Sequence, residues 1–143
     1  MIIPFSVFRE KIESGEKCQT IRKYSPGQYQ RFLNCWKKRE TTGRYNLFWH
    51  NPRNGGTRIK DVVPSEKPFL IAFNRSYGQM HVRVLPRMGF EESKECLRND
   101  APILADLARL DGFKNASDMW NWFETTYGRE MFQSKFVVIR WLP

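Results

Sequence analysis

The last strand-like segment of the chain, KFVVIRW at Lys135–Trp141, constrains the fold most. Its β-branched and aromatic residues predict a strand. A strand at the end of a chain is held in place by pairing with strands formed earlier, because its own neighbours in sequence are helical here. We therefore expect this segment to pair back into a sheet built from the preceding part of the chain.

The middle of the chain supplies candidate partners for that strand. The segment Met80–Pro86 alternates apolar with polar or basic residues, which is typical of a half-buried strand. The turn residues NRSYGQ separate it from the apolar run before it and predict a hairpin. The strand-like segments are Arg44–His50, Thr57–Val63, Pro68–Asn74 and Met80–Pro86.

A short helix is predicted near the start, over Ser6–Ser14, with Ser6 as its N-cap. Gly15 is a natural stop for this helix. The next residues, Thr20–Arg22, have the character of a short strand, and the turn signal SPG at Ser25–Gly27 is expected to end it.

Two further helices are predicted in the C-terminal third. Asp100 is a candidate N-cap for the first, and the break at Gly112 ends it. Asn115 caps the second, which ends at Gly128. One face of the second helix is aromatic, and we interpret that face as core packing: Trp120, Phe123 and Tyr127.

Strands grouped in the middle with helices set apart from them favour an α+β fold over an alternating α/β fold. The length of 143 residues suits a single domain, residues 1–143. We expect a small, mostly antiparallel β-barrel with flanking helices.

Charge is unevenly distributed in this basic protein, whose formal net charge is +9. Between Lys17 and Lys60 there are eleven basic residues and a single acid, Glu40. Between Glu91 and Glu130 there are nine acids and five bases. A basic half interleaved with aromatics is suited to nucleic acid, since cations hold phosphates and rings stack on unpaired bases. The alternative is a basic surface that only confers solubility.

Neither a disulfide framework nor a metal site is indicated. The three cysteines, Cys18, Cys35 and Cys96, are odd in number and lack CxxC spacing. His50 and His81 are the two histidines and are far apart in sequence. We therefore expect no cofactor.

No membrane segment is expected, because no apolar run approaches the roughly 18 residues of a membrane helix. The longest strongly apolar run is FLIAF, Phe69–Phe73, and charges occur early in the N-terminal segment. A secretory signal peptide is therefore not indicated. We expect a soluble, cytoplasmic protein without a membrane partner, and the sequence leaves its oligomeric state open.

The segment SGEKCQTIRKYSPG contains Gly15, Lys17, Thr20 and Arg22 in the spacing G-x-K-x-x-T-x-R. In this respect it resembles the start of an ASCH domain, a branch of the PUA-like superfamily. The later segment LARLDGFKNASDMWNWFETTYG and the closing FVVIRW resemble that family's later helix and last strand. The resemblance covers most of the chain and departs from the family over 28–64, which is longer here.

This resemblance implies a PUA-like barrel with a cleft beside the first helix, and RNA or a modified nucleoside as the ligand. One family branch hydrolyses an acetylated cytidine amide with a Lys, a Thr and an acid, and another is described as a ribonuclease. By matching of motifs, the Lys is Lys17 and the Thr is Thr20. The acid is Asp111, where that branch has Glu.

The chemistry of such a site makes demands that the sequence meets only in part. Lys17 is a base only when neutral, and burial or a nearby cation lowers its pKa. In a regular strand Lys17 and Thr20 point to opposite faces, so they converge only if the chain bends after Gly15. Thr20 and Arg22 share a face of any strand. Each residue also has an ordinary interpretation: a surface lysine, a strand threonine and a turn aspartate.

These observations lead to three functional hypotheses. The first is an RNA- or nucleotide-binding domain, with a basic cleft that includes Arg22, Lys23, Lys37, Lys38, Arg39 and Arg58. The alternative is a small metal-independent hydrolase, an N4-acetylcytidine amidohydrolase or a ribonuclease, that uses Lys17, Thr20 and Asp111. The third is a protein-interaction module in which part of MWNWF is exposed.

Overall fold

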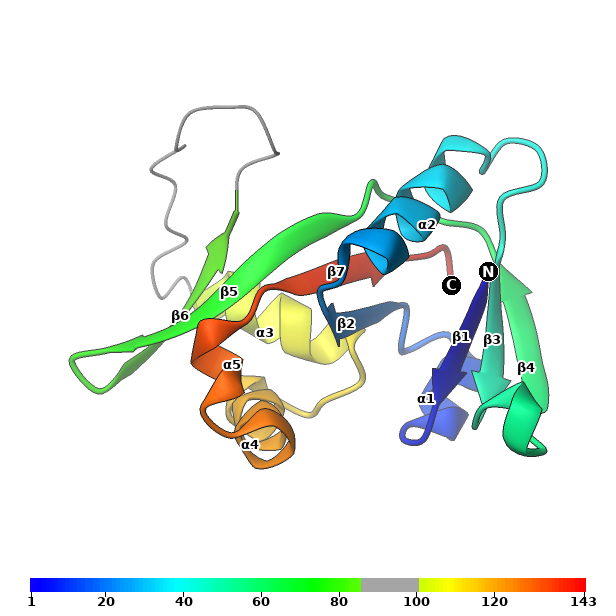
Figure 1. The fold of residues 1–143 in the computed structure, drawn as a ribbon. Coiled ribbons are helices and arrows are strands. Elements are labelled where there is room, and N and C mark those ends of the chain that lie inside the picture. The colour runs from blue at the N-terminus through cyan, green and yellow to red at the C-terminus, as the bar shows by residue number, and fades with distance from the viewer. Residues whose placement is uncertain (86–100) are drawn as a thin grey trace.

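The structure is a computed structural model that describes residues 1–85 and 101–143. Its secondary structure is mixed, with strands and helices in several short segments (Figure 1). In chain order the elements are β1 (Ile2–Phe5), α1 (Arg9–Ser14), β2 (Gln19–Lys23), α2 (Pro26–Lys37), β3 (Tyr45–Trp49), the 3-10 turn η1 (Pro52–Asn54), β4 (Thr57–Val62), β5 (Phe69–Ser76), β6 (Gln79–Val84), α3 (Ala101–Leu110), α4 (Ala116–Tyr127), α5 (Glu130–Gln133) and β7 (Phe136–Arg140).

The strands form a three-stranded sheet in the order β1-β3-β4 and a four-stranded sheet in the order β2-β7-β5-β6. All neighbours are antiparallel except β1 and β3, which are parallel. The predicted strands in the middle of the chain are confirmed as β3 to β6, and the predicted hairpin is β5–β6. The closing strand pairs back as expected, between β2 and β5.

Strand β7 is buried on both faces and separates two hydrophobic cores. Phe136 and Val138 belong to the first core, whereas Val137 and Ile139 belong to the second. All four side chains are fully buried. This alternation follows from the two-residue period of a strand, and it explains why the segment is almost entirely apolar.

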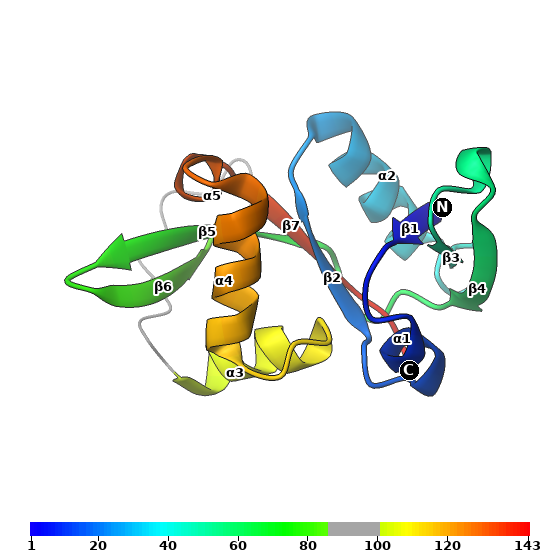
Figure 2. The same cartoon turned by 90° about the horizontal axis from the view of Figure 1, so that it is seen from below.

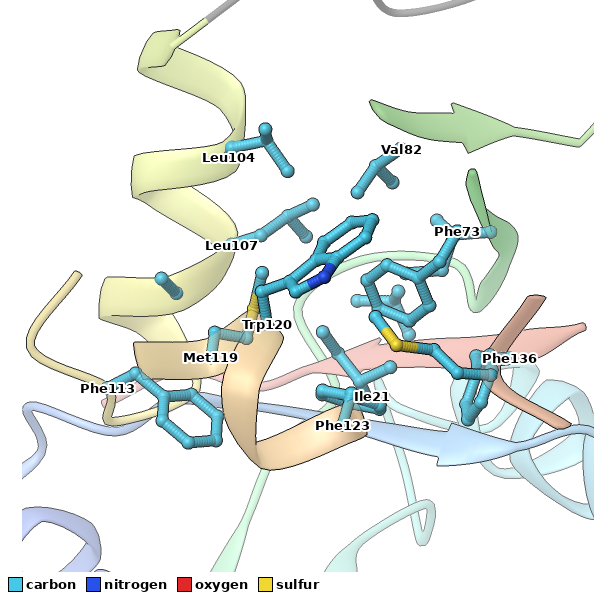
Figure 3. Close-up of a cluster of buried hydrophobic side chains, with 14 residues drawn as sticks. Ile21, Phe73, Val82, Leu104, Leu107, Phe113, Met119, Trp120, Phe123 and Phe136 are labelled. Carbon is cyan, nitrogen blue, oxygen red and sulfur yellow. The ribbon is translucent and has the colours of Figure 1, made fainter. Parts of the chain in front are cut away.

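Helices α3 and α4 cover one face of the four-stranded sheet and enclose the first core. The rings of Trp120, Phe123, Phe73 and Phe136 meet at its centre (Figure 3). The predicted core face of α4 is thus confirmed for Trp120 and Phe123, which are 2% and 0% exposed. Tyr127 is half-buried at the edge of this core.

The second core lies between the three-stranded sheet, helices α1 and α2, and the other face of β7. It contains Ile12 of α1 and Phe32 of α2, together with Tyr45 and Leu47 of β3. Residues 63–68 connect β4 to β5, and within this connection Pro64 pairs with Trp141, the residue that follows β7.

The predicted α+β class is confirmed. Within the described residues the strands form two sheets, and no closed barrel is found.

The N-terminal region differs from the sequence prediction. Ile2–Phe5 forms β1, which the sequence analysis missed, and helix α1 begins at Arg9, after Phe8 in the N-cap position. The prediction of Ser6 as the N-cap is therefore wrong. The strand was missed because it has four residues and includes Pro4; its partner is β3, more than forty residues away in sequence.

The SPG turn at Ser25–Gly27 is the start of helix α2, with Ser25 as the N-cap and Pro26 in the first turn. A proline in the first turn favours a helix start as well as a turn, so this signal was ambiguous.

The predicted ends of α4 are confirmed. The Asp118 N–H donates a hydrogen bond to the Asn115 side chain, and Gly128 ends the helix as predicted. The predicted Asp100 cap, Cys96 and Pro86 lie outside the described residues.

Across residues 1–85 and 101–143, every helix is too short or too polar to cross a membrane.

Candidate functional site

The turn after α1 places Lys17 beside the end of α3. Gly15 ends α1 in the left-handed conformation, with φ of 86°, which a residue without a Cβ adopts at little cost. The Lys17 N–H then donates to the Lys11 carbonyl (2.9 Å), and the Cys18 N–H donates to the Leu110 carbonyl (3.0 Å). The bend that the sequence analysis required after Gly15 is present.

Asp111 meets Lys17 at the end of α3. The Lys17 amine donates to both the backbone carbonyl and the Oδ1 of Asp111. Lys17 is 2% exposed and Asp111 is 3% exposed, so both groups of this ion pair lie out of solvent. The pairing of two residues 94 positions apart, inferred only from motif resemblance, is therefore a direct contact in the fold.

Burial dominates the electrostatics of this pair. It lowers the pKa of the Lys17 amine, an effect that Asp111 opposes and Arg22 reinforces. Burial likewise raises the pKa of the Asp111 carboxyl, against the effects of Lys17, Arg22 and a hydrogen bond from the Ile21 backbone. Burial thus moves each pKa in the direction of the uncharged form, whereas the opposite charge of the partner favours the charged form of each group.

A neutral lysine amine has two N–H bonds and one lone pair. The two hydrogen bonds to Asp111 engage both N–H bonds, which leaves the lone pair for another group. An amine held in this way can accept a proton, which is the requirement for a general base.

Thr20 and Arg22 extend the site along β2, an edge strand of the four-stranded sheet. Thr20 is 6% exposed. The guanidinium of Arg22 lies 5.2 Å above the ring of Phe5 and donates to the Pro4 carbonyl. Among residues 1–85 and 101–143, the Nε of Arg22 is buried without a hydrogen-bond partner. A buried N–H of this kind is available to a ligand.

These four residues line one cavity of about 180 Å³ at the edge of β2. Figure 2 shows β2 between α3 and α4 on one side and β1 with α1 on the other. The cavity has a polar part and aromatic walls. Its polar part includes Lys17, Thr20, Arg22 and Asp111, together with Ser6 in the segment before α1. Its aromatic walls are Phe5, Phe8, Phe113, Trp122 and Tyr127.

The other predicted nucleic-acid contacts lie outside this cavity. Lys23, at the exposed end of β2, donates to Glu130 (2.6 Å), and Arg58 of β4 pairs with Asp61. Lys37 and Lys38 are exposed at the end of α2. Arg39 stacks on the ring of Trp36 at 4.4 Å. These residues present cations on the surface and do not converge on Lys17.

The aromatic walls are the part of the site that the sequence analysis missed. Phe5 and Phe8 reach the cavity from β1 and the turn that follows it, whereas Trp122 and Tyr127 reach it from α4. Their signal in the sequence was an excess of aromatics, 15% of residues, but aromatic residues are also what cores are built from. Only the fold distinguishes the two uses.

The cysteines and the aromatic segment MWNWF do not form a second site in the described residues. Cys18 and Cys35 are half-buried, and burial raises the pKa of each thiol, which disfavours a reactive thiolate. Trp120 is buried and Trp122 packs against Phe113 at 5.9 Å, so neither forms an exposed docking patch. No cluster of three or more metal-ligating side chains occurs within the described part of the chain.

Comparisons with protein-family models, curated proteins and solved structures found no match to this chain. The chemistry of the cavity is therefore the main guide to function.

Proposed function

We propose that this protein binds a nucleobase, from RNA or from a free modified nucleoside, in the cavity beside β2. The observation that carries the proposal is a polar set inside aromatic walls, in which Lys17, Thr20 and Asp111 are buried and Arg22 is half-buried. A planar base has an apolar face that stacks on rings and a polar edge that needs donors and acceptors. The cavity offers both.

The size of the cavity favours a small ligand group. Its volume of about 180 Å³ is below the roughly 300–1,000 Å³ of pockets that take drug-sized ligands. A single base fits this scale better than a dinucleotide, and the attached sugar and phosphate then remain outside. This arrangement supports recognition of one base at a time.

We also infer that the chain is an ASCH domain with a PUA-like barrel. The order of the two sequence motifs supports this inference. So does the contact of Lys17 with Asp111, which the resemblance pairs. The bridge between Pro64 and Trp141 joins the two sheets on one side, and Arg22 reaches Pro4 across the other. These links are compatible with a partly closed barrel.

The surface of α2 is suited to hold an RNA backbone. Helix α2 carries Arg31 and Lys37 and has no acidic residue, and Lys38 and Arg39 follow it directly. Arg39 lies over Trp36, so this surface also offers a ring for stacking. We propose that it follows the phosphates of the RNA whose base enters the cavity.

The first test is equilibrium binding of free nucleosides to the protein and to Thr20→Val. We expect binding of at least one nucleoside. We expect Thr20→Val to weaken it by about fivefold, since one hydrogen bond is worth about 1 kcal/mol. Thr20→Ser keeps the hydroxyl and is the matched control. Equal affinity of all three proteins would show that the ligand does not use this side of the cavity.

The second test is binding of single-stranded RNA over a salt series. Phosphate contacts release counterions, so affinity must fall as salt rises. Replacing Lys37, Lys38 and Arg39 with Gln together removes up to three such contacts and lowers the salt slope by about one unit for each. Arg109→Gln, in the more acidic C-terminal part, is the control. Salt-independent binding would contradict the proposal.

A second candidate function, amide hydrolysis, is favoured by the burial of Lys17, which lowers the pKa of its amine. Lys17 and Thr20 line the same cavity, and Asp111 accepts two hydrogen bonds from the Lys17 amine. In this mechanism the lone pair of the neutral amine takes the Thr20 hydroxyl proton. The Thr20 oxygen then bonds to the acyl carbon of an N-acylated base, and Arg22 offsets the charge on the resulting oxyanion. When the C–N bond breaks, Lys17 returns the proton to the leaving amine. Lys17 then takes a proton from water, and the hydroxide adds to the acyl carbon. The bond between that carbon and the Thr20 oxygen breaks, and Lys17 gives the proton to Thr20 as the acid leaves.

This second candidate is tested with N4-acetylcytidine and measurement of the acetate released. The rate should rise with pH as Lys17 loses its proton. The midpoint should lie below the ordinary lysine value of about 10.4, because burial lowers the pKa of Lys17. Thr20→Val should abolish turnover, and Thr20→Ser should retain part of it. Acetate release by Thr20→Val at the normal rate would exclude Thr20 as the nucleophile.

A further inference from the structure

Phe8 has an unusual backbone conformation next to the cavity. Its φ of 63° and ψ of 30° place it in the left-handed region, at the N-cap of α1, and its side chain makes no cap hydrogen bond. Such a conformation is unfavourable for a residue with a bulky side chain. The surrounding structure must therefore hold Phe8 in place, and the contacts of its ring show what the conformation achieves.

The ring of Phe8 fits against Gly112, the residue that follows Asp111. A Cβ built on Gly112 would lie 3.0 Å from two ring carbons of Phe8 and 3.4 Å from the Lys17 Cδ. Gly112 also has a positive φ, 96°, so both its lack of a side chain and its backbone suit this position. The Phe8 ring thus lies against Gly112, next to Asp111 in the sequence, and its centre is 5.5 Å from the Lys17 amine.

Two further contacts tie the same segments together. The rings of Phe8 and Phe113 meet edge to face at 5.0 Å. The Lys11 amine donates to the Gly112 carbonyl (2.7 Å) and lies 5.5 Å from the centre of the Phe8 ring. The turn before α1 and the turn after α3 are therefore fastened to each other around Lys17.

We propose that Phe8 is a positioning residue: its ring shields the Lys17–Asp111 pair from water and, through Gly112, fixes the position of the Asp111 oxygens. The purpose of this shielding rests on the proposed function, because the second candidate function requires a shielded, neutral Lys17 amine. The shielding itself is independent of any ligand and is tested without one.

The shielding sets the direction of the expected change at Lys17. Several titratable or charged groups surround the amine: Asp111 after α3, Arg22 of β2, the adjacent Cys18, Lys11 of α1 and Tyr127 of α4. Desolvation is the largest influence on its pKa. Without the Phe8 ring, water reaches the amine and the pKa of Lys17 rises towards its ordinary value.

One contact opposes this change. The Lys17 amine lies 5.5 Å from the centre of the Phe8 ring, a geometry that favours the charged amine and would be lost with the ring. That distance is near the outer limit for such interactions, and Phe5 provides an equal one at 5.5 Å that remains. We therefore expect the gain in hydration to outweigh the lost ring contact, so that the pKa of Lys17 rises when the Phe8 ring is removed.

The experiment is trace acetylation of the protein with acetic anhydride over a pH series. The acetylated fraction of Lys17 is read by peptide mass spectrometry. In the unchanged protein the Lys17 midpoint should lie below the ordinary lysine value of about 10.4. In Phe8→Ala the midpoint should move up towards that value. Phe8→Gly is the second variant, because glycine adopts the left-handed backbone freely and offsets part of the lost packing.

The matched control is Phe69→Ala. Phe69 is a half-buried phenylalanine that packs against the same core as Phe8 but does not line the cavity. The Phe69→Ala variant should have lower thermal stability than the unchanged protein but the same Lys17 midpoint. An unchanged Lys17 midpoint in Phe8→Gly, or an equal shift in Phe69→Ala, would overturn the proposal.

The labelling also separates this inference from the proposed function. If the Lys17 midpoint shifts in Phe8→Gly but the unchanged protein binds no nucleoside, the role of Phe8 is supported and the proposed ligand is rejected. If the unchanged protein binds a nucleoside but the midpoint does not shift in Phe8→Gly, the proposed ligand is supported and the role of Phe8 is rejected.

Discussion

At the scale of single residues, the buried pair of Lys17 and Asp111 dominates both stability and chemistry. Removing one partner of a buried pair leaves the other without compensation, which typically lowers the free energy of unfolding by roughly 3–5 kcal/mol. We expect a loss of this order for Lys17→Met in urea denaturation near neutral pH. The double variant Lys17→Met/Asp111→Asn should recover much of it, because an uncharged amide replaces the lone carboxyl.

The same two variants predict a pH dependence. Burial raises the pKa of Asp111 in the folded protein even though Lys17 opposes the shift, so removing Lys17 should raise it further above its unfolded value. Stability from such a group is complete below the unfolded value and is lost as pH rises through the folded value. The stability difference between Lys17→Met and the double variant should therefore shrink as the solution is acidified towards the ordinary aspartate pKa of about 3.9. A difference that grows on acidification would contradict burial as the main influence.

Tyr45 gives a second prediction at this scale. Its hydroxyl is buried without a hydrogen-bond partner among the described residues, and burial raises the pKa of the phenol. Tyr45→Phe removes an unsatisfied polar group, so the free energy of unfolding should stay equal or rise by about 1 kcal/mol. Because the unfolded phenol ionises first, the original protein should also lose stability as pH rises above about 10, and the variant should lose less. If the free energy of unfolding fell equally in both proteins as pH rises above about 10, this prediction would be wrong.

At the scale of elements, helix α4 depends on its N-cap. The Asn115 side chain accepts a hydrogen bond of 2.8 Å from the Asp118 N–H. Asn115→Ala should lower the free energy of unfolding by about 1 kcal/mol, whereas Asn115→Asp should retain it. Exposed Ser117→Ala is the control and should have little effect. The measurement is the urea midpoint, and equal midpoints for Asn115→Ala and Ser117→Ala would show that the cap is unimportant.

Helix α4 was predictable because each of its signals is local. The cap at Asn115, the aromatic face and the stop at Gly128 all lie within one segment of the sequence. Helix α2 has equally local signals, but Ser25 and Pro26 suit a turn and a helix start alike. What distinguishes the two outcomes is the burial of Phe32 against Tyr45, a contact between different elements.

At the scale of the whole molecule, the two sheets are joined near the C-terminal end of β7. The Trp141 N–H donates to the Cys18 carbonyl (3.0 Å), and the Leu142 N–H donates to the Val63 carbonyl (2.9 Å). The Trp141 ring is 2% exposed and lies 6.2 Å from the Phe5 ring. Trp141 therefore connects β1 with the approach to β2, and the neighbouring Leu142 bonds to the residue that follows β4.

We expect Trp141→Ala to lower the free energy of unfolding by roughly 3–5 kcal/mol, the usual cost of emptying a buried aromatic site. Hydrogen exchange should accelerate in β1 and β3 more than in α4, because α4 packs in the other core. Leu142→Ala, at a side chain that is 54% exposed, is the control. Uniform acceleration across both cores would show that Trp141 does not act locally.

The sequence by itself determined the segments whose signals are local: β3 to β7, the end of α1 at Gly15, and the capped helix α4. It also determined the α+β class and the charge asymmetry. Only tertiary structure decided that β1 pairs with β3, that α2 is a helix, and that Lys17 meets Asp111 inside aromatic walls. The physical reason is the separation along the sequence over which each kind of interaction acts. Caps, turns and periodicity act within a few residues, whereas the burial that shifts the pKa of Lys17 comes from β1, β2, α3 and α4 together.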